Sequence, residues 1–104
     1  MAYPIDRKTL ASASAAATGD VTIPNADGWL RHRLYVVISN AATVKAKVSP
    51  DDGATWFQVG SDVTATGILE FNGPYRDAKV TWASNNGTVT IIAEQVYEHP
   101  ATVV

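Results

Sequence analysis

The excess of residues branched at Cβ over leucine constrains the fold of this chain more than any other feature of the sequence. Valine, isoleucine and threonine together number 29, whereas leucine, the usual filler of helical cores, occurs 4 times. Side chains branched at Cβ lose rotamer freedom in helices and fit well on a pleated, half-buried surface. Alanine is abundant, with 16 copies, but five of them fall within residues 11–17. The composition therefore predicts a β-protein.

Size, charge and cysteine content exclude several functional classes. The chain has 104 residues, which corresponds to one domain. It has no cysteine, which excludes disulfides and thiolate zinc sites. Its net charge of -2 argues against binding to nucleic acid, which requires a clustered basic surface. No apolar run approaches the length that crosses a bilayer, and charged residues at positions 6–8 interrupt any signal peptide, so no membrane association is expected.

Short segments with alternating apolar and polar residues predict seven strands. Val44, Ala46 and Val48 are expected to point inward, with Lys45 and Lys47 outward. The expected strands are 20–24, 33–40, 43–49, 55–60, 67–73, 76–84 and 88–97. Tight turns are expected at 41–42 and at the Asn-Asn-Gly sequence 85–87, each closing a β-hairpin. The predicted fold is all-β, a single antiparallel β-sandwich or jelly-roll-like small barrel of about seven to eight strands, with an extended N-terminal arm.

The two ends of the chain lack this alternation. Residues 1–19 are predicted to form an N-terminal arm, residues 20–98 the β-domain and residues 99–104 a tail that follows Pro100. The arm is either a mobile end or a segment that orders against a neighbouring subunit. In the second case Tyr3, Ile5 and Leu10 are its partner-contact candidates. This division predicts that removal of the arm leaves the stability of the domain nearly unchanged.

The most distinctive local motif is the sequence Ser-Pro-Asp-Asp-Gly-Ala-Thr-Trp at residues 49–56. It resembles the Asp-box, a turn found in sialidases and many other β-proteins. Asp51 is expected to accept hydrogen bonds from the loop backbone, and Gly53 to adopt a positive φ. Trp56 is expected to pin the loop to the core. The motif occurs once in a chain too short for a propeller, so it predicts a rigid hairpin and not sugar hydrolysis.

No set of side chains suggests catalysis. The two histidines, His32 and His99, are expected to be exposed and without a chemical role. The aspartates at positions 51, 52 and 62 lack the spacing of a calcium loop. No glycine-rich phosphate loop follows a strand. We therefore expect no enzymatic activity, no metal and no cofactor.

The aromatic residues divide into two groups. Trp56 and Trp82 lie in strand patterns and are expected in the core. Trp29 and Tyr75 lie in predicted loops beside arginines, and Trp, Tyr and Arg are enriched at protein interfaces. These aromatic residues either contact a partner or cap one end of the barrel. The further partner-contact candidates are Trp29, Arg31, Tyr75 and Arg76.

Residues 44–94 contain a strand, the Asp-Gly-Ala-Thr-Trp turn, a Val-Gly pair, a Thr-Ala-Thr-Gly step, a Gly-Pro-Tyr-Arg corner and paired strands rich in valine and threonine. In this pattern the segment resembles small virion proteins of tailed bacteriophages. The resemblance implies a capsid decoration protein, made in the host cytoplasm and located on the capsid surface of the virion. Its partners would be major capsid protein subunits and sister copies, so homo-oligomers are expected on the particle. The alternatives are a tail, fibre or collar module and a carbohydrate-binding accessory domain.

Overall fold

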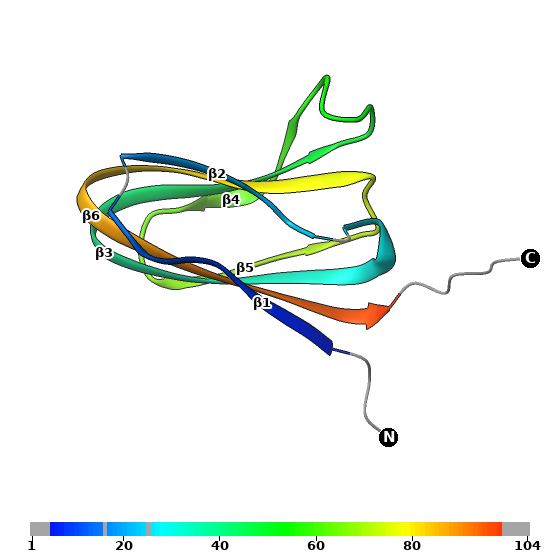
Figure 1. The fold of residues 1–104 in the computed structure, drawn as a ribbon, viewed down its shortest axis with the longest axis horizontal. Helices are drawn as coiled ribbons and strands as arrows, with labels where there is room; N and C mark the ends of the chain where they lie inside the picture. Colours follow the sequence, from blue (N-terminus) through cyan, green and yellow to red (C-terminus); the bar gives the residue numbers. More distant parts are fainter. Residues whose placement is uncertain (1–4, 16, 25, 99–104) are drawn as a thin grey trace, which may run out of the picture.

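The chain folds into one antiparallel sheet of six strands that is bent over on itself (Figure 1). A computed structural model describes residues 5–15, 17–24 and 26–98, with only the backbone described for residues 85, 86, 97 and 98. The strands are β1 (Ile5–Ser14), β2 (Thr18–Thr22), β3 (Trp29–Ser49), β4 (Phe57–Val63), β5 (Gly67–Asn72) and β6 (Asp77–Glu98). A short 3-10 helix, η1 (Ala26–Gly28), precedes β3.

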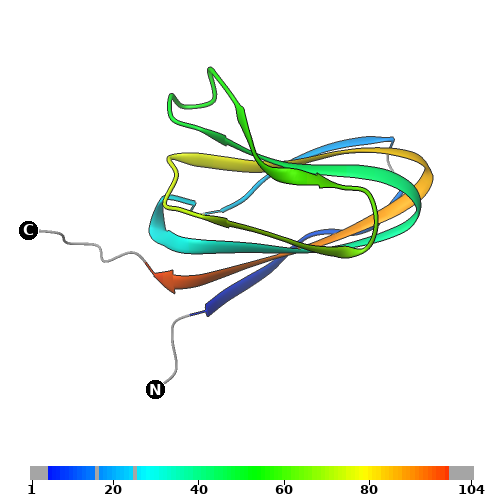
Figure 2. The ribbon, with the colours of Figure 1, turned by 180° about the vertical axis from the view of Figure 1, so that it is seen from behind.

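Two long strands organise the whole sheet. β3 and β6 pair along nearly their full length, from Trp29 opposite Glu98 to Ser49 opposite Asp77. Both strands curve back at their midpoints, so each contributes to two layers (Figures 1 and 2). The first layer contains β1, the C-terminal half of β6, the N-terminal half of β3, and β5. The second layer contains β2, the N-terminal half of β6, the C-terminal half of β3, and β4.

The bend is built from a break in the β3–β6 pairing. The register shifts between Ser39 and Ala41, where Asn40 has a φ of 72°. Opposite it, the Ser84 hydroxyl accepts a hydrogen bond from the Gly87 amide at 3.2 Å and donates one to the Gly87 carbonyl at 2.9 Å. Such bulges increase local twist and bend a strand. The two layers therefore share the strands β3 and β6 and belong to one continuous sheet.

The predicted all-β fold is confirmed, but the prediction of two hairpin turns is wrong. Residues 41–42 and 85–87 do not close hairpins; they lie inside β3 and β6 and mark the bend. The predicted strands on either side of each turn are the two halves of one long strand. A hairpin was expected at 85–87 because Asn-Gly favours positive φ, and at 41–42 because the connection is short. The positive φ recorded at the bend is that of Asn40 in β3.

The expected N-terminal arm is also corrected. Residues 5–14 form β1, which pairs with β6 from Ile5 opposite Val96 to Ser14 opposite Val89. The predicted boundary at Asp20 falls inside β2, which pairs with the other half of β6. Small and polar residues can form this strand because an edge strand buries few side chains. In β1 the buried residue is Ala11. The tail, residues 99–104, lies outside the described residues.

The core lies between the two layers and follows the predicted alternation. Val44, Ala46 and Val48 are buried, whereas Lys45 and Lys47 lie on the outer surface. The same alternation buries Leu34, Val36, Leu69, Phe71, Ala78, Val80, Trp82, Val89, Ile91 and Ala93. Packing of these side chains from both layers removes apolar surface from water and holds the bent sheet closed. No helix among the described residues is long and apolar enough to cross a membrane.

Candidate interaction surfaces

The Asp-box-like turn has the predicted geometry. The Asp51 carboxylate accepts hydrogen bonds from the Ser49 hydroxyl and the Thr55 amide, both at 2.8 Å. The Ser49 hydroxyl in turn accepts one from the Gly53 amide at 2.8 Å. Gly53 has a φ of 88°, which confirms the expected positive value. These hydrogen bonds, first that of Ser49 and then those of Thr55, lower the pKa of Asp51 and favour its charged form.

Trp56 does not belong to the buried core, contrary to expectation. It is half-buried just before β4, with the Lys79 ammonium 4.3 Å from the centre of its ring. The ring also lies beside Gly53, where an added Cβ would be 3.4 Å away. A cation over an aromatic face is an attractive contact. Trp56 thus ties the turn to the outer surface of the second layer.

The structure brings several predicted contact residues together at the end of the molecule opposite the bend, which we call the open end (Figures 1 and 2). The segments around Trp29 and Tyr75 are joined by two backbone hydrogen bonds, from Tyr75 to Ala26 at 3.1 Å and from Gly73 to Leu30 at 2.7 Å. Arg31 and Ile5 both pair with Val96, one on each side of it.

Individual exposures at the open end differ. Ile5 is 57% exposed and Leu30 39% exposed, and Arg31 and Arg76 are exposed as well. Arg76 forms an ion pair with Asp52 of the Asp-box-like turn. Trp29 is half-buried, and so is Tyr75, which packs against the core and lies 6.0 Å from the Phe71 ring.

Among the described partner-contact candidates of the arm, Leu10 lies away from the open end. Leu10 is half-buried and packs against the core, and its role as a partner contact stays a prediction. The register of β1 shifts between Thr9 and Ala11, and Leu10 lies at that irregularity. Tyr3 lies outside the described residues.

His32 is buried rather than exposed as expected. It is 1% exposed, stacks on Phe71 with ring centres 4.9 Å apart, and has Nδ1 3.4 Å from Gln95 Nε2. Strand alternation explains this position, because it places Arg31 and Arg33 outward and the residue between them inward. Burial lowers the pKa of His32 and favours the neutral imidazole. His99 lies outside the described residues.

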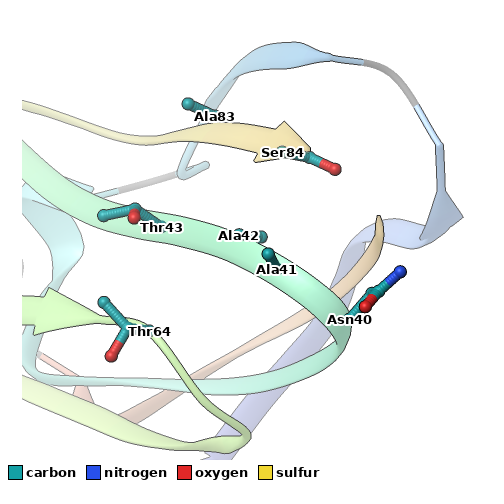
Figure 3. A pocket seen from close by; sticks show the side chains of 7 residues that line it. All are labelled: Asn40, Ala41, Ala42, Thr43, Thr64, Ala83 and Ser84. Atoms are coloured by element: carbon teal, nitrogen blue, oxygen red, sulfur yellow. The ribbon is translucent and has the colours of Figure 1, made fainter. Parts of the chain in front are cut away.

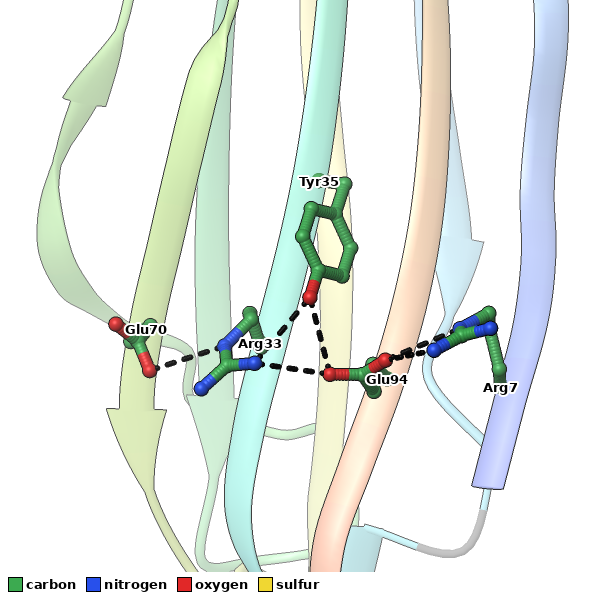
Figure 4. Close-up of polar contacts among 5 residues, drawn as sticks. All are labelled: Arg7, Arg33, Tyr35, Glu70 and Glu94. Atoms are coloured by element: carbon green, nitrogen blue, oxygen red, sulfur yellow. Dashed lines mark hydrogen bonds and ion pairs between the residues drawn. The ribbon is translucent and has the colours of Figure 1, made fainter. Parts of the chain in front are cut away.

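Sequence reasoning missed a row of charges across the outer face of the first layer (Figure 4). Arg7 of β1, Glu94 of β6, Arg33 of β3 and Glu70 of β5 are direct cross-strand neighbours, in that order. We call these four residues the charge row. Their signs alternate along it. The row joins segments from both ends and the middle of the chain, so no local sequence pattern reveals it.

Hydrogen bonds link every neighbouring pair in the charge row. Arg7 donates to Glu94 through Nε at 3.0 Å and also through Nη2, and Arg33 donates to Glu94 at 3.0 Å and to Glu70 at 3.1 Å. The Tyr35 hydroxyl accepts from Arg33 at 3.2 Å and donates to Glu94 at 3.0 Å.

Glu94 is the enclosed member of the row. It is 4% exposed although it points outward, because its partners cover it. The hydrogen bond from Arg7, and then that of Tyr35, lower the pKa of Glu94 despite this burial. Its carboxylate is therefore held in the charged form.

A shallow depression lies where the strands bend (Figure 3). Its volume is about 480 Å³, and its lining consists of Asn40, Ala41, Ala42, Thr43, Thr64, Ala83 and Ser84. These small side chains bring no titratable group to it. Among the described residues, no three His, Cys, Asp or Glu side chains lie together in a way that could hold a metal ion.

Comparison with known proteins reveals similarity of fold. No protein family matches the chain, and no curated protein matches it either. The Yersinia pseudotuberculosis-derived mitogen (YPM) has a TM-score of 0.50 at 10% identity, over 95% of this chain and 89% of its own. This likeness supports the all-β architecture alone.

Two further solved structures are less similar. PirA has a TM-score of 0.48 at 8% identity, over 89% of this chain and 93% of its own. The Drosophila NLP core has a TM-score of 0.31 at 15% identity, over 94% of this chain and 100% of its own. Similarity at this level carries no argument about function.

Proposed function

We propose that this chain is a non-enzymatic structural protein of a bacteriophage virion, located on the capsid surface as a decoration protein. In this role it clamps adjacent major capsid protein subunits and stabilises the head. The observation that carries the proposal is the open end. There, Ile5, Trp29, Arg31, Tyr75 and Arg76, all expected to contact a partner, come together from three separate segments of the chain.

The composition of the open end fits a protein contact. Exposed apolar side chains, Ile5 and Leu30, lie among arginines and half-buried aromatic rings. Aromatic residues and arginine are the types enriched in interface centres. Ile5, Trp29 and Arg31 lie in paired strands, so their backbone is already ordered before binding and less conformational entropy is lost there.

The mechanism we propose is avidity over a closed shell. Each copy makes a modest contact with two or more capsid subunits. Repetition over a symmetric particle converts these contacts into strong retention, because each further contact is intramolecular once the first has formed. No chemical step is required.

The test is co-sedimentation of the purified chain with undecorated, expanded capsids of the phage whose genome encodes it. We expect saturable binding at a fixed ratio to the major capsid protein. Leu30→Asp places a carboxylate in the open end and should weaken binding at least about tenfold, the effect of losing one interface anchor. Thr64→Asp, an equally simple change at an exposed residue near the bend, should bind normally.

Two results would overturn the proposal. One is the absence of binding by the unmodified chain to capsids that lack it. The other is equal binding by the Leu30→Asp and Thr64→Asp variants, which would place the contact elsewhere. Thermal unfolding of both variants shows that any loss of binding comes from the surface and not from misfolding.

A further inference from the structure

The charge row lies in the middle of an outer face that is otherwise partly apolar. Successive residues of a strand alternate between faces, so positions two apart share the same face. Ile5 is two residues before Arg7, and Ile68 two residues before Glu70; each is 57% exposed. Val37, four residues after Arg33, is 50% exposed. Large apolar side chains thus flank the row on both sides.

The order of signs in the charge row makes this face complementary to itself. The row reads positive, negative, positive, negative from β1 to β5. A two-fold axis parallel to the strands, between β6 and β3, reverses the row in a second copy. Arg7 then faces Glu70 of that copy, and Glu94 faces its Arg33. An axis along the row would instead set each charge against itself.

The exposed ends of the charge row are the groups available to a second copy. The Arg7 side chain is 63% exposed and the Glu70 side chain 49% exposed, whereas Glu94 is enclosed within the row. The two inner members of the row, Glu94 and Arg33, therefore already have hydrogen-bond partners within one chain. Two Arg7–Glu70 ion pairs, one at each end of the row, would be the polar gain of pairing.

We propose that the outer face of the first layer is a self-association surface, on which two copies of this chain pair through the charge row and its apolar neighbours. A two-fold axis, the commonest symmetry of homo-oligomers, relates the two copies and runs parallel to the strands. This pairing does not rest on the proposed function, because it depends on the charge row and Ile68, which lie outside the open end, although Ile5 and Arg31 border both surfaces.

The size of the face sets the strength of the pairing. Four strands about 4.8 Å apart, and a length of about 20 Å from Arg31 to Val37, give a face of roughly 400 Å². Stable complexes bury about 800 Å² on each partner. The dimer should therefore be weak in dilute solution and form as the concentration rises. On a particle, where copies lie close together, the same contact would be populated.

The test is sedimentation equilibrium of the purified chain at low salt, from about 10 μM to 1 mM, the range for a weak contact. The average mass should rise from that of a monomer towards that of a dimer. Arg7→Glu sets like charges against each other at both ends of the pair, and so does Glu70→Arg. Each variant alone should stay monomeric, and an equimolar mixture should associate, because the mixed pair restores both attractions.

A second pair of variants tests the proposal even if the charge-reversed variants fail to fold. Ile68→Lys changes an exposed side chain on the face and should weaken association at least about tenfold. Phe57→Lys changes a side chain of β4 in the second layer that is 55% exposed, and should associate normally.

The proposal is overturned if the unmodified chain remains monomeric throughout this range. It is also overturned if Ile68→Lys and Phe57→Lys associate equally, or if the folded charge-reversed variants associate alone. Capsid co-sedimentation of the Ile68→Lys variant separates the two proposals. Retained binding by a monomeric variant shows that the open end functions without this pairing.

Discussion

Replacement of Gly87 by alanine tests whether the bend requires close contact between the two long strands. A Cβ atom built at Gly87 would lie 2.4 Å from the Ser39 carbonyl oxygen and 2.9 Å from that of Ala41. Both obstacles are backbone atoms of β3, so no side chain can move aside to make room. We therefore expect Gly87→Ala to push β3 and β6 apart at the bend.

The size of the effect follows from the overlap. A carbon and an oxygen in ordinary contact are about 3.3 Å apart, so the backbone must shift by roughly 0.9 Å against well-packed neighbours, a case of overpacking. Such forced shifts cost about 2–3 kcal/mol of unfolding free energy. For a domain of this size, this corresponds to a fall in melting temperature of about 10–20 °C.

The assay is thermal and urea unfolding followed by far-ultraviolet circular dichroism. Gly28→Ala is the matched control, because a Cβ at Gly28 would meet nothing within 4 Å. It should change the free energy of unfolding by less than about 0.5 kcal/mol. Equal stability of the two variants would refute the reasoning, since the bend would then tolerate a side chain at its closest approach.

Three further predictions concern the turn, the charge row and the first strand. Gly53→Val should destabilise the chain by about 1–2 kcal/mol or more, because φ is 88° there; an unchanged urea midpoint would contradict this. The lowered pKa of Glu94 means that its ionised form stabilises the fold above its ordinary pKa of 4.5 and that this contribution is lost as the pH falls below it. The stability difference between the unmodified chain and Glu94→Gln should therefore shrink from pH 6 to pH 3, and a constant difference in urea titrations would count against the charge row. Deletion of residues 2–18 should abolish cooperative thermal unfolding, because it removes β1 and the start of β2; a deletion variant that melts like the full chain would restore the original boundary at Asp20.

Much of the fold could be predicted from single strands, because alternation is a local property. The inward positions of Val44, Ala46 and Val48 and the positive φ of Gly53 were predicted correctly. Both depend on residues within one strand or one turn, and neighbouring residues are enough to determine them.

Pairing between distant segments could not be predicted in this way. The Asn-Asn-Gly sequence at 85–87 was interpreted as a hairpin turn, but in the structure Gly87 lies where β6 passes close to the backbone of β3, and a side chain there would meet the Ser39 and Ala41 carbonyl oxygens. β1 was missed because its partner, β6, is almost a whole chain length away. The charge row depends on the register of three such pairings, and only the structure supplies them.

The same pairings determine when the sheet can form during synthesis. β1 leaves the ribosome long before its partner β6, because Ile5 pairs with Val96, and the outer face is complete only when the C-terminal half of β6 has emerged. Contacts this distant in sequence must overcome the entropy of closing a long loop, so all-β chains of this kind fold slowly. Until β6 arrives, β3 presents an unpaired edge to other nascent chains. Assembly should therefore be sensitive to crowding on the ribosome, where unpaired strand edges promote aggregation.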